Sequence, residues 1–310
     1  MNIQNILITG KIQMDMKKII SKKGIEKQFR FLSEQEVTAE DCKWADAYVG
    51  FRPSAHFNLS FLKWVHALGA GVDSFLFDRE WDKDVLLTRT LCSFGKRISE
   101  YCLSYILRDV QRHVQFESQQ TNKNWQEWEP AMLASQTVVI FGTGVIGQEI
   151  ARTLSFFGVR TIGVSRTGSR KQYFHQIIKN SDVKQVLSNV DWVISTLPLT
   201  KDTYEYFNDS FFSQLRGAGF INVGRGRTVK EAALIEALME EYIRLAVLDV
   251  VAQEPLPEES PLWTLPNVTI TPHISALTSP EEAIDCFLET LDRLENGEPL
   301  LNRVNIEAGY

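Results

Sequence analysis

Short apolar runs alternate with amphipathic stretches along most of the 310 residues of the chain. The first ninety residues contain four runs with the length and composition of strands, NILITGKI, KQFRFLS, DAYVGF and LKWVHAL. Between the first two runs, MDMKKIISKKG has helical periodicity and ends at Gly24, a residue typical of helix C-termini. Strands joined by helical connections predict an α/β domain with a parallel sheet.

The alternation changes at about residue 98 and begins again at residue 137. Residues 98–122 have the pattern of one long helix, followed by NWQEWEP, which is too apolar for a flexible linker and is expected to pack on something. Strands are then expected at 137–141, 160–164, 191–195, 219–223 and 245–250, with a helix in each connection. A last helix is expected from Pro280 to Asn296, before Gly297. This series predicts a second, doubly wound α/β domain.

Composition excludes several classes of protein. A hydrophobic fraction of 44% and a charged fraction of 23% are typical of globular domains. The net charge of −6 argues against a general nucleic-acid binder, and no apolar run reaches the roughly 18 residues of a membrane span. The first residues resemble a strand rather than a signal peptide, and the four cysteines lie far apart without a CxxC pair. We therefore expect a cytoplasmic protein with reduced thiols and no metal site.

The stretch VVIFGTGVIGQEIA carries a glycine turn between a strand and a helix. Gly142 permits a tight turn, Gly144 lets the backbone approach a pyrophosphate, and Gly147 lets the helix pack on the strand. Val145 and Ile146 begin the helix, whose N-terminus favours an anion. In this context GxGxxG predicts a dinucleotide site, although the turn alone could be purely structural.

The end of the next strand lacks the acid that usually holds the ribose of NAD. Ser165 can donate a hydrogen bond to a 2′-phosphate, and Arg166, next to Thr167, can add a bidentate charged contact. Arg170 and Lys171 add positive charge, and the alternative is an ordinary solvated loop. We favour NADP(H) as the cofactor, with NAD(H) possible.

Three later stretches, FINVGRGRTV, LDVVAQEPLPEE and ITPHISA, each stand where a sheet strand is expected to end. With TLPLTKDT and ALGAGVD, they stand in the order found in the D-isomer-specific 2-hydroxyacid dehydrogenases, and the chain closely resembles that family. The resemblance covers nearly the whole chain and is weakest in the N-terminal domain, which helps to shape the substrate pocket. The Ser165–Thr167 segment is similar to that of the family's NADPH-using glyoxylate and hydroxypyruvate reductases.

The resemblance implies a role for three side chains. Arg225 would bind the substrate carboxylate and polarise the keto oxygen. His273 would be the catalytic acid and base, and Glu254 would orient its ring and favour its charged form. Taken singly, each could be a structural or surface residue. His56, His66, His113 and His175 have no such context and are interpreted as structural or surface residues.

The family also implies contacts for substrate and cofactor. A second carboxylate contact would come from the backbone at Ala70, Gly71 and Val72. Asp249 would lie near the nicotinamide end of the cofactor. Further cofactor contacts are expected at Leu197, Pro198, Val223, Gly224 and Ser275.

The resemblance implies a flavodoxin-like substrate domain from residues 1–94 and 277–310, and a Rossmann NAD(P)-binding domain from residues 95–276. The expected reaction is NADPH-dependent reduction of glyoxylate or hydroxypyruvate to the D-2-hydroxy acid. Two alternatives remain: an NADH-linked D-lactate- or phosphoglycerate-type dehydrogenase, and a non-enzymatic nucleotide-sensing protein. The long helix and tryptophan segment suggest a homodimer, in which Trp125 or Trp128 enters the partner's active site or packs at the interface.

Overall fold

The computed structural model describes residues 1–310, and the chain divides into two compact units. The first unit combines Met1–Cys92 with Thr278–Tyr310, and the second unit spans Ser93–Leu277. The divisions expected from the sequence, after residues 94 and 276, lie within two residues of these boundaries.

The first unit contains a five-stranded parallel sheet in the order β2-β1-β3-β4-β5. Its strands are β1 (Asn5–Thr9), β2 (Gln28–Leu32), β3 (Ala47–Gly50), β4 (Trp64–Ala67) and β5 (Leu86–Arg89). This order is that of flavodoxin-like folds.

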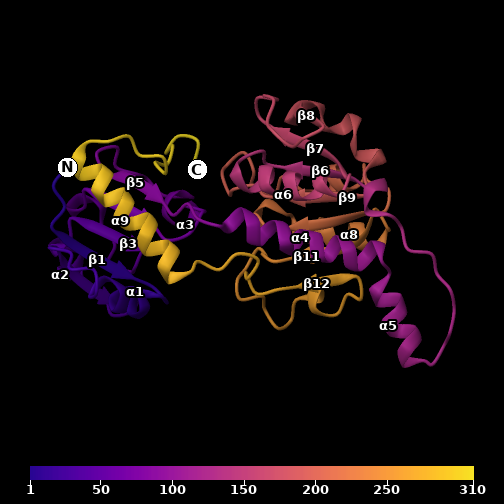
Figure 1. Cartoon of the computed structure of the whole chain (residues 1–310), viewed down its shortest axis with the longest axis horizontal. Helices are drawn as coiled ribbons and strands as arrows, with labels where there is room; N and C mark the ends of the chain where they lie inside the picture. The colour runs from indigo at the N-terminus through magenta and orange to yellow at the C-terminus, as the bar shows by residue number, and fades with distance from the viewer. The chain divides into compact units, whose positions relative to one another are not determined.

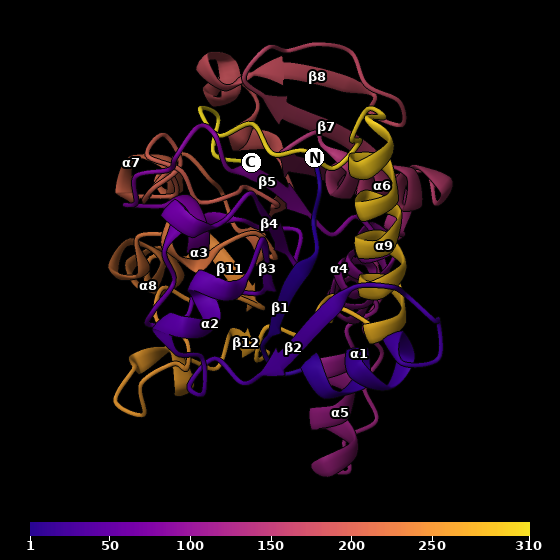
Figure 2. The ribbon, with the colours of Figure 1, turned by 90° about the vertical axis from the view of Figure 1, so that its left-hand side faces the viewer.

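Helices cover both faces of the first sheet (Figure 2). The helices are α1 (Gln13–Ile20), α2 (Ala39–Trp44), α3 (Asp73–Leu76) and α9 (Pro280–Asn296). On one face, residues of α1 and α9 share a core with Ile6, Val49 and Trp64 of the sheet. On the other face, residues from α2 and α3 pack with Leu7 and Tyr48. The C-terminal helix is therefore part of the first unit, and it ends before Gly297, as the sequence predicts.

The second unit contains a seven-stranded parallel sheet in the order β12-β11-β10-β9-β6-β7-β8 (Figure 1). Its strands are β6 (Thr137–Phe141), β7 (Arg160–Ser165), β8 (Gln176–Lys179), β9 (Trp192–Ser195), β10 (Ala218–Asn222), β11 (Ile243–Leu248) and β12 (Val268–Ile270). The order reverses between β6 and β9, as in a Rossmann fold. The expected class, two doubly wound α/β domains, is confirmed.

The helices of the second unit are α4 (Phe94–Val110), α5 (His113–Thr121), α6 (Val145–Phe156), α7 (Asp209–Phe212) and α8 (Glu231–Met239). Residues of α7 and α8 pack on one face of the sheet, in a core that includes Phe141 and Phe220. Helices α4 and α6 pack against each other, where Gly95 brings α4 close to Glu149 (Figure 1). None of the helices combines the length and hydropathy that a membrane crossing requires.

Two expected helices were wrong. The helix expected at 98–122 is broken at Arg112, which has a left-handed backbone with φ of +56° and separates α4 from α5. The connection between β7 and β9 contains strand β8 and two short 3₁₀ turns instead of an α-helix.

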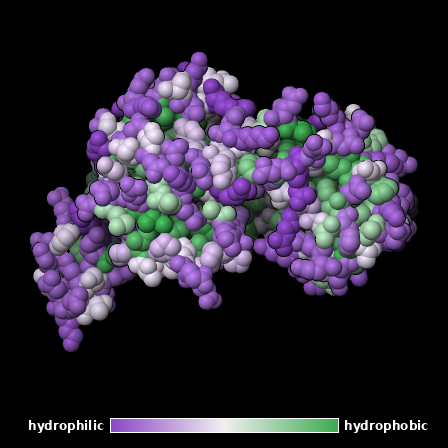
Figure 3. Space-filling model, turned by 180° about the vertical axis from the view of Figure 1, so that it is seen from behind, coloured by the Kyte–Doolittle hydropathy of each residue, from purple (hydrophilic) through white to green (hydrophobic).

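The tryptophan segment is exposed and makes only local contacts within the chain, among them the Arg112 guanidinium over the ring of Trp128. Helix α5 buries none of its residues, and residues 121–130 are all exposed. Helix α5 and the segment after it project from the body of the second unit (Figure 1). The projection is mostly hydrophilic, whereas apolar residues gather on the body of the unit (Figure 3).

Candidate active site

The expected site residues of the second unit share one edge of its sheet. All seven strands are parallel, so their carboxyl ends meet at the same edge, and ligands of doubly wound sheets bind there, where the strand order reverses. Following the strand order, the segments at this edge are 271–275 after β12, 249–254 after β11, 223–226 after β10, 196–198 after β9, 142–147 after β6 and 165–167 at the end of β7.

The glycine turn connects β6 to α6 at the point of reversal. Gly142 has φ of +97°, and a Cβ there would lie 2.3 Å from Oγ1 of Thr196. A Cβ on Gly147 would lie 1.9 Å from the carbonyl oxygen of Gly142, so the helix can pack this closely only with glycine. No atom lies within 4 Å of a Cβ placed on Gly144, and Val145 is 70% exposed.

The N-terminus of α6 therefore fits a pyrophosphate. No side chain caps this helix, and its N-cap, Gly144, is exposed. Ile146, the second residue of the helix, is half-buried. Backbone amides at an uncapped, open helix N-terminus favour a bound anion.

The turn after β7 offers polar groups for a phosphate. Ser165 Oγ accepts a hydrogen bond from the amide of Gly168 at 3.1 Å, which leaves its own proton to donate. The side chains of Arg166 and Thr167 are exposed, and Thr167 Oγ1 lies 2.8 Å from Oγ of Ser169. Polar donors and a guanidinium thus stand where an acid would hold the ribose of NAD.

Strand β8 places a further cation beside this turn. Lys179 is the register partner of Ser165. A Cβ on Gly168 would lie 2.9 Å from Cγ of Lys179, so the lysine side chain runs along the turn. Sequence reasoning missed Lys179 because its strand was not expected.

A buried asparagine shapes the segment that carries Arg225. Asn222 ends β10; its Oδ1 accepts from the amide of Gly224 at 3.1 Å, and its Nδ2 donates to the carbonyl of Arg225 at 3.2 Å. The half-buried Arg225 side chain donates to the Gly224 carbonyl at 2.7 Å. A Cβ on Gly226 would lie 1.9 Å from the carbonyl oxygen of Val251, so glycine lets this segment touch the one after β11.

The remaining expected cofactor contacts lie between these segments. A Cβ on Gly224 would lie 2.5 Å from the carbonyl oxygen of Leu197. Val223 is buried, and Leu197 and Pro198 are half-buried. The loops after β9 and β10 are therefore in close contact at the sheet edge.

Asp249 organises the loop that follows β12. The side chain is 2% exposed, and its Oδ1 accepts from Oγ1 of Thr271 at 2.6 Å and from the amide of Ile274 at 2.8 Å. Its Oδ2 accepts from the amide of Ser275 at 3.0 Å, and its backbone carbonyl accepts from the amide of His273 at 2.9 Å. The hydrogen bonds of this carboxylate thus shape the 271–275 loop.

His273 and Glu254 meet as the sequence suggests. Nδ1 of His273 lies 2.8 Å from Oε2 of Glu254, and the two side chains are 48% and 40% exposed. Oε1 of Glu254 accepts from the amide of Val251 at 3.3 Å, which holds the carboxylate in place. A carboxylate at Nδ1 fixes the N–H there and leaves Nε2 to exchange a proton with a bound molecule.

The expected carboxylate contact of the first unit lies in the loop between β4 and α3. Val72 is buried and is the N-cap residue of α3, and Ala70 and Gly71 are half-buried. Arg89, at the end of β5, donates from Nη1 to the carbonyl of Ala70 at 3.1 Å. This hydrogen bond fixes the conformation of the 70–72 loop, whose backbone amides are the expected carboxylate contact.

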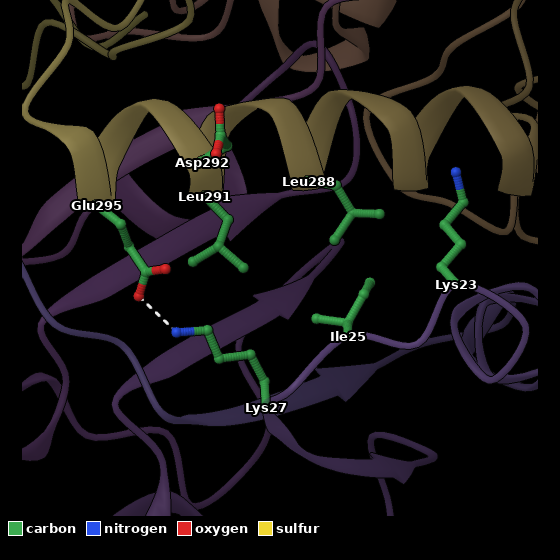
Figure 4. A pocket seen from close by; sticks show the side chains of 7 residues that line it. All are labelled: Lys23, Ile25, Lys27, Leu288, Leu291, Asp292 and Glu295. Carbon is green, nitrogen blue, oxygen red and sulfur yellow. Dashed lines mark hydrogen bonds and ion pairs between the residues drawn. The ribbon is translucent and has the colours of Figure 1, made fainter.

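A surface hollow of the first unit lies elsewhere, beneath α9 (Figure 4). Leu288 and Leu291 point from α9 toward Ile25, and Lys27 reaches Glu295 at 2.6 Å. The other charged residues that line the hollow also have partners. Lys23 forms an ion pair with Asp285, and Asp292 accepts a hydrogen bond from Asn296. None of the expected site residues lines this hollow, and its charges are already paired.

Sequence reasoning also missed three polar residues at the edge of the second sheet. Asn222 and Thr271 stand within motifs already identified, where a polar side chain at a strand end was the available signal. Tyr101 lies in the long helix expected from residue 98, and nothing in that pattern singled it out; its hydroxyl lies 2.7 Å from Oγ1 of Thr271.

Comparison with known proteins gives consistent results. Residues 103–275 match the family described as D-isomer specific 2-hydroxyacid dehydrogenase, NAD binding domain. The chain is 34% identical over 294 residues to glyoxylate/hydroxypyruvate reductase A of Klebsiella pneumoniae strain 342, covering 92% of this chain and 94% of that protein.

Two solved structures are similar over nearly the whole chain. One is a D-isomer specific 2-hydroxyacid dehydrogenase from Xanthobacter autotrophicus Py2 in complex with NADPH and MES, with a TM-score of 0.89, 30% identity and complete coverage of both chains. The other is an NADPH-dependent glyoxylate/hydroxypyruvate reductase from Sinorhizobium meliloti in complex with NADP and sulfate. Its TM-score is 0.88 at 29% identity, covering 99% of this chain and all of that one.

Proposed function

This chain belongs to the D-isomer-specific 2-hydroxyacid dehydrogenase family and is an NAD(P)-dependent oxidoreductase, and from that premise we propose that it reduces glyoxylate or hydroxypyruvate with NADPH. The product is the 2-hydroxy acid, in the D configuration where it is chiral. The observation that carries the proposal is the Glu254–His273 pair, 2.8 Å apart at the sheet edge beside Arg225's segment. A protein that only senses a nucleotide has no need of this acid–base pair.

Substrate and cofactor are supported by the named relatives. The Klebsiella pneumoniae relative is a glyoxylate/hydroxypyruvate reductase, and the two similar structures hold NADPH or NADP. In this chain, the open N-terminus of α6 suits the pyrophosphate, and Ser165, Arg166 and Lys179 suit the 2′-phosphate. Asp249 is proposed for the nicotinamide end. Further cofactor contacts are proposed at Leu197, Pro198, Val223, Gly224 and Ser275.

The proposed reaction consumes a 2-keto acid, NADPH and a proton and yields the 2-hydroxy acid and NADP⁺. The bound cofactor supplies a hydride to the keto carbon. His273 donates its Nε2 proton to the keto oxygen as that carbon is reduced, and Glu254 keeps the ring oriented through Nδ1. The Arg225 guanidinium binds the substrate carboxylate and stabilises the charge that develops on the oxygen. The backbone amides around Ala70, Gly71 and Val72 are proposed as a second carboxylate contact.

The test is steady-state kinetics of the full chain with glyoxylate, hydroxypyruvate, pyruvate and phosphohydroxypyruvate, each with NADPH and NADH. We expect the highest kcat/KM with one of the first two acids and NADPH. His273→Ala removes the proton donor and should lower kcat by about 10²- to 10⁴-fold, with NADPH affinity unchanged by fluorescence titration. His113→Ala, at an exposed histidine of α5, is the control.

Three outcomes would contradict the proposal. A strong preference for NADH would point to the lactate- or phosphoglycerate-type alternative. Undiminished turnover in His273→Ala would remove the assigned acid. NADPH binding without turnover of any of the four acids would favour a nucleotide-sensing role.

A further inference from the structure

We propose that Tyr101 of α4 is a positioning residue for His273, acting through a directed hydrogen-bond relay from Tyr101 to Thr271 to Asp249. The inference rests on the proposed function, because it concerns the acid of that reaction. Tyr101 lies 170 positions before Thr271 in the sequence, and no motif connects the two.

The direction of the relay follows from counting protons. Thr271 has one hydroxyl proton, and its Oγ1 lies 2.6 Å from Oδ1 of Asp249, which also accepts the amide of Ile274. Because the carboxylate accepts and Thr271 has given it its proton, the Tyr101 hydroxyl, 2.7 Å away, donates to Thr271. The relay therefore has one orientation and leaves the Thr271 hydroxyl without rotational freedom.

The loop needs such support because His273 is in a strained conformation. Its φ is +55°, in the left-handed region that residues other than glycine rarely adopt. Such a conformation persists where several surrounding contacts determine it. Here the amides of His273, Ile274 and Ser275 all donate to Asp249. Asp249 in turn is held through Thr271 by Tyr101.

The Tyr101 hydroxyl can serve as a permanent donor. Burial raises the pKa of its phenol well above the ordinary value, more than the bond to Thr271 lowers it. The hydroxyl thus keeps its proton at every pH at which an imidazole titrates. Its ring packs against that of Tyr105 at a tilt of 60°, with centroids 4.8 Å apart, which fixes its position on α4.

The same helix also holds the end of the loop. Arg97 lies one turn before Tyr101 on α4, and its guanidinium donates to the carbonyl of Leu277. Leu277 is the last residue of the second unit, and α4 begins one residue after that unit starts. Helix α4 therefore supports the 271–277 segment at two places, Thr271 and Leu277. Thr271, which Tyr101 contacts, is the nearer of the two to His273 in sequence.

The test begins with Tyr101→Phe, which keeps the ring and removes the donor. We expect kcat for glyoxylate reduction to fall about tenfold, the usual effect of one lost hydrogen bond, with NADPH affinity unchanged. Tyr105→Phe is the matched control, because it removes a tyrosine hydroxyl one turn further along the same helix. Thr271→Ser retains the hydroxyl and should retain activity, whereas Thr271→Val should match Tyr101→Phe.

A double-mutant cycle separates the relay from general destabilisation. If Tyr101 acts through Thr271, the double variant Tyr101→Phe with Thr271→Val should be no slower than the slower single variant. Additive losses, an unchanged kcat in Tyr101→Phe, or a loss confined to NADPH affinity would each overturn the proposal.

A measurement independent of turnover keeps the two proposals distinguishable. In ¹⁵N-histidine-labelled protein, with the His273 signal identified from His273→Gln, its ring resonances should shift in Tyr101→Phe and stay in place in Tyr105→Phe. An unshifted His273 signal would overturn the positioning role. A wild-type enzyme inactive with every 2-keto acid, but with the shift present, would overturn the proposed reaction alone.

Discussion

Two threonine hydroxyls fix the protonation of His66, a wholly buried residue of β4. Nε1 of Trp64 donates to Thr88 Oγ1 at 2.8 Å, and the same oxygen lies 2.8 Å from Nδ1 of His66. Nε2 of His66 lies 3.2 Å from Thr90 Oγ1, which donates to the carbonyl of Ala67 at 3.1 Å. Because the Thr90 proton is engaged with Ala67, Nε2 donates to Thr90, and Nδ1 of the neutral ring accepts the Thr88 proton. A second ring proton, on Nδ1, would break this hydrogen bond from Thr88.

Burial accordingly lowers the pKa of His66 from 6.5 to about 3. The folded-state value lies below the unfolded one, so the stability that this residue contributes is complete above pH 6.5 and is lost as the pH falls toward 3. We expect the free energy of unfolding to decrease by up to about 1.4 kcal/mol per pH unit from this group between pH 6.5 and about 5. Urea denaturation at a series of pH values measures this slope.

His66→Gln cannot take up a proton and should flatten the slope, whereas His113→Gln, on exposed α5, should leave it as in the wild type. Equal slopes in the wild type and His66→Gln would show that His66 does not carry this pH dependence.

At single residues, the sequence predicted pairs within recognised motifs and failed for contacts outside them. Glu254 and His273 were expected together, and the structure brings them within 2.8 Å. The contact between Tyr101 and Thr271 could not be predicted, because it depends on the rotation of α4 relative to the sheet edge. Periodicity gives the apolar face of a helix and does not say which polar residue meets a given loop.

Among the elements, the two errors have physical causes. Helix α4 ends because the chain returns to it: the amide of Ala131 donates to the carbonyl of Val110, and Arg112 Nε donates to the carbonyl of Glu129. Beyond Val110 no residue of α5 is buried, so the apolar pattern had already ended there. Strand β8 was missed because it is a four-residue edge strand with only two apolar residues, too short for a clear period-two signal.

Strand β8 matters because it carries Lys179 beside Ser165. We expect Lys179→Met, which keeps most of the aliphatic chain, to weaken NADPH binding several-fold to tenfold through the loss of one charged contact to the 2′-phosphate. Binding of NADH, which lacks that phosphate, should not change. Isothermal titration with 2′,5′-ADP and with 5′-AMP isolates the phosphate contribution.

Lys184→Met, in the 3₁₀ turn after β8, is the control for a general change in charge. Equal weakening toward NADPH and NADH would contradict a phosphate contact and indicate damage to the strand. The same 2′,5′-ADP affinity in Lys179→Met and wild type would exclude the contact altogether.

At the scale of the whole molecule, alternation of strands and helices predicted two parallel α/β sheets, and both sheets are wholly parallel. The strand orders could not come from periodicity, because a one-dimensional pattern does not specify which strands are neighbours. The expectation of Rossmann and flavodoxin-like strand orders came from the GxGxxG turn and the family resemblance. The pattern does not say whether a second chain covers residues 121–130, which are all exposed in the single chain.

The exposed tryptophans of residues 121–130 bear on the homodimer expected from the sequence. Trp125 is 97% exposed, and Trp128 is 42% exposed with the Arg112 guanidinium 5.4 Å from its ring. Indoles this exposed are unusual on a free surface and typical of interfaces. We expect the wild type to be a dimer by light scattering.

Trp125→Ala should raise the dimer dissociation constant at least tenfold if the indole packs at the interface, since a buried tryptophan contributes about 2 kcal/mol or more. If the indole enters the partner's active site, the dimer should persist and KM for the 2-keto acid should rise. Met239→Ala, at an exposed apolar residue of α8, should change neither quantity. A wild-type protein that stays monomeric at every concentration would leave the projecting segment without a role in assembly. So would a Trp125→Ala variant with the dissociation constant and the KM of the wild type. The separate effects on dissociation and on KM thus distinguish a dimer that only holds two copies together from one in which each copy completes the other's site.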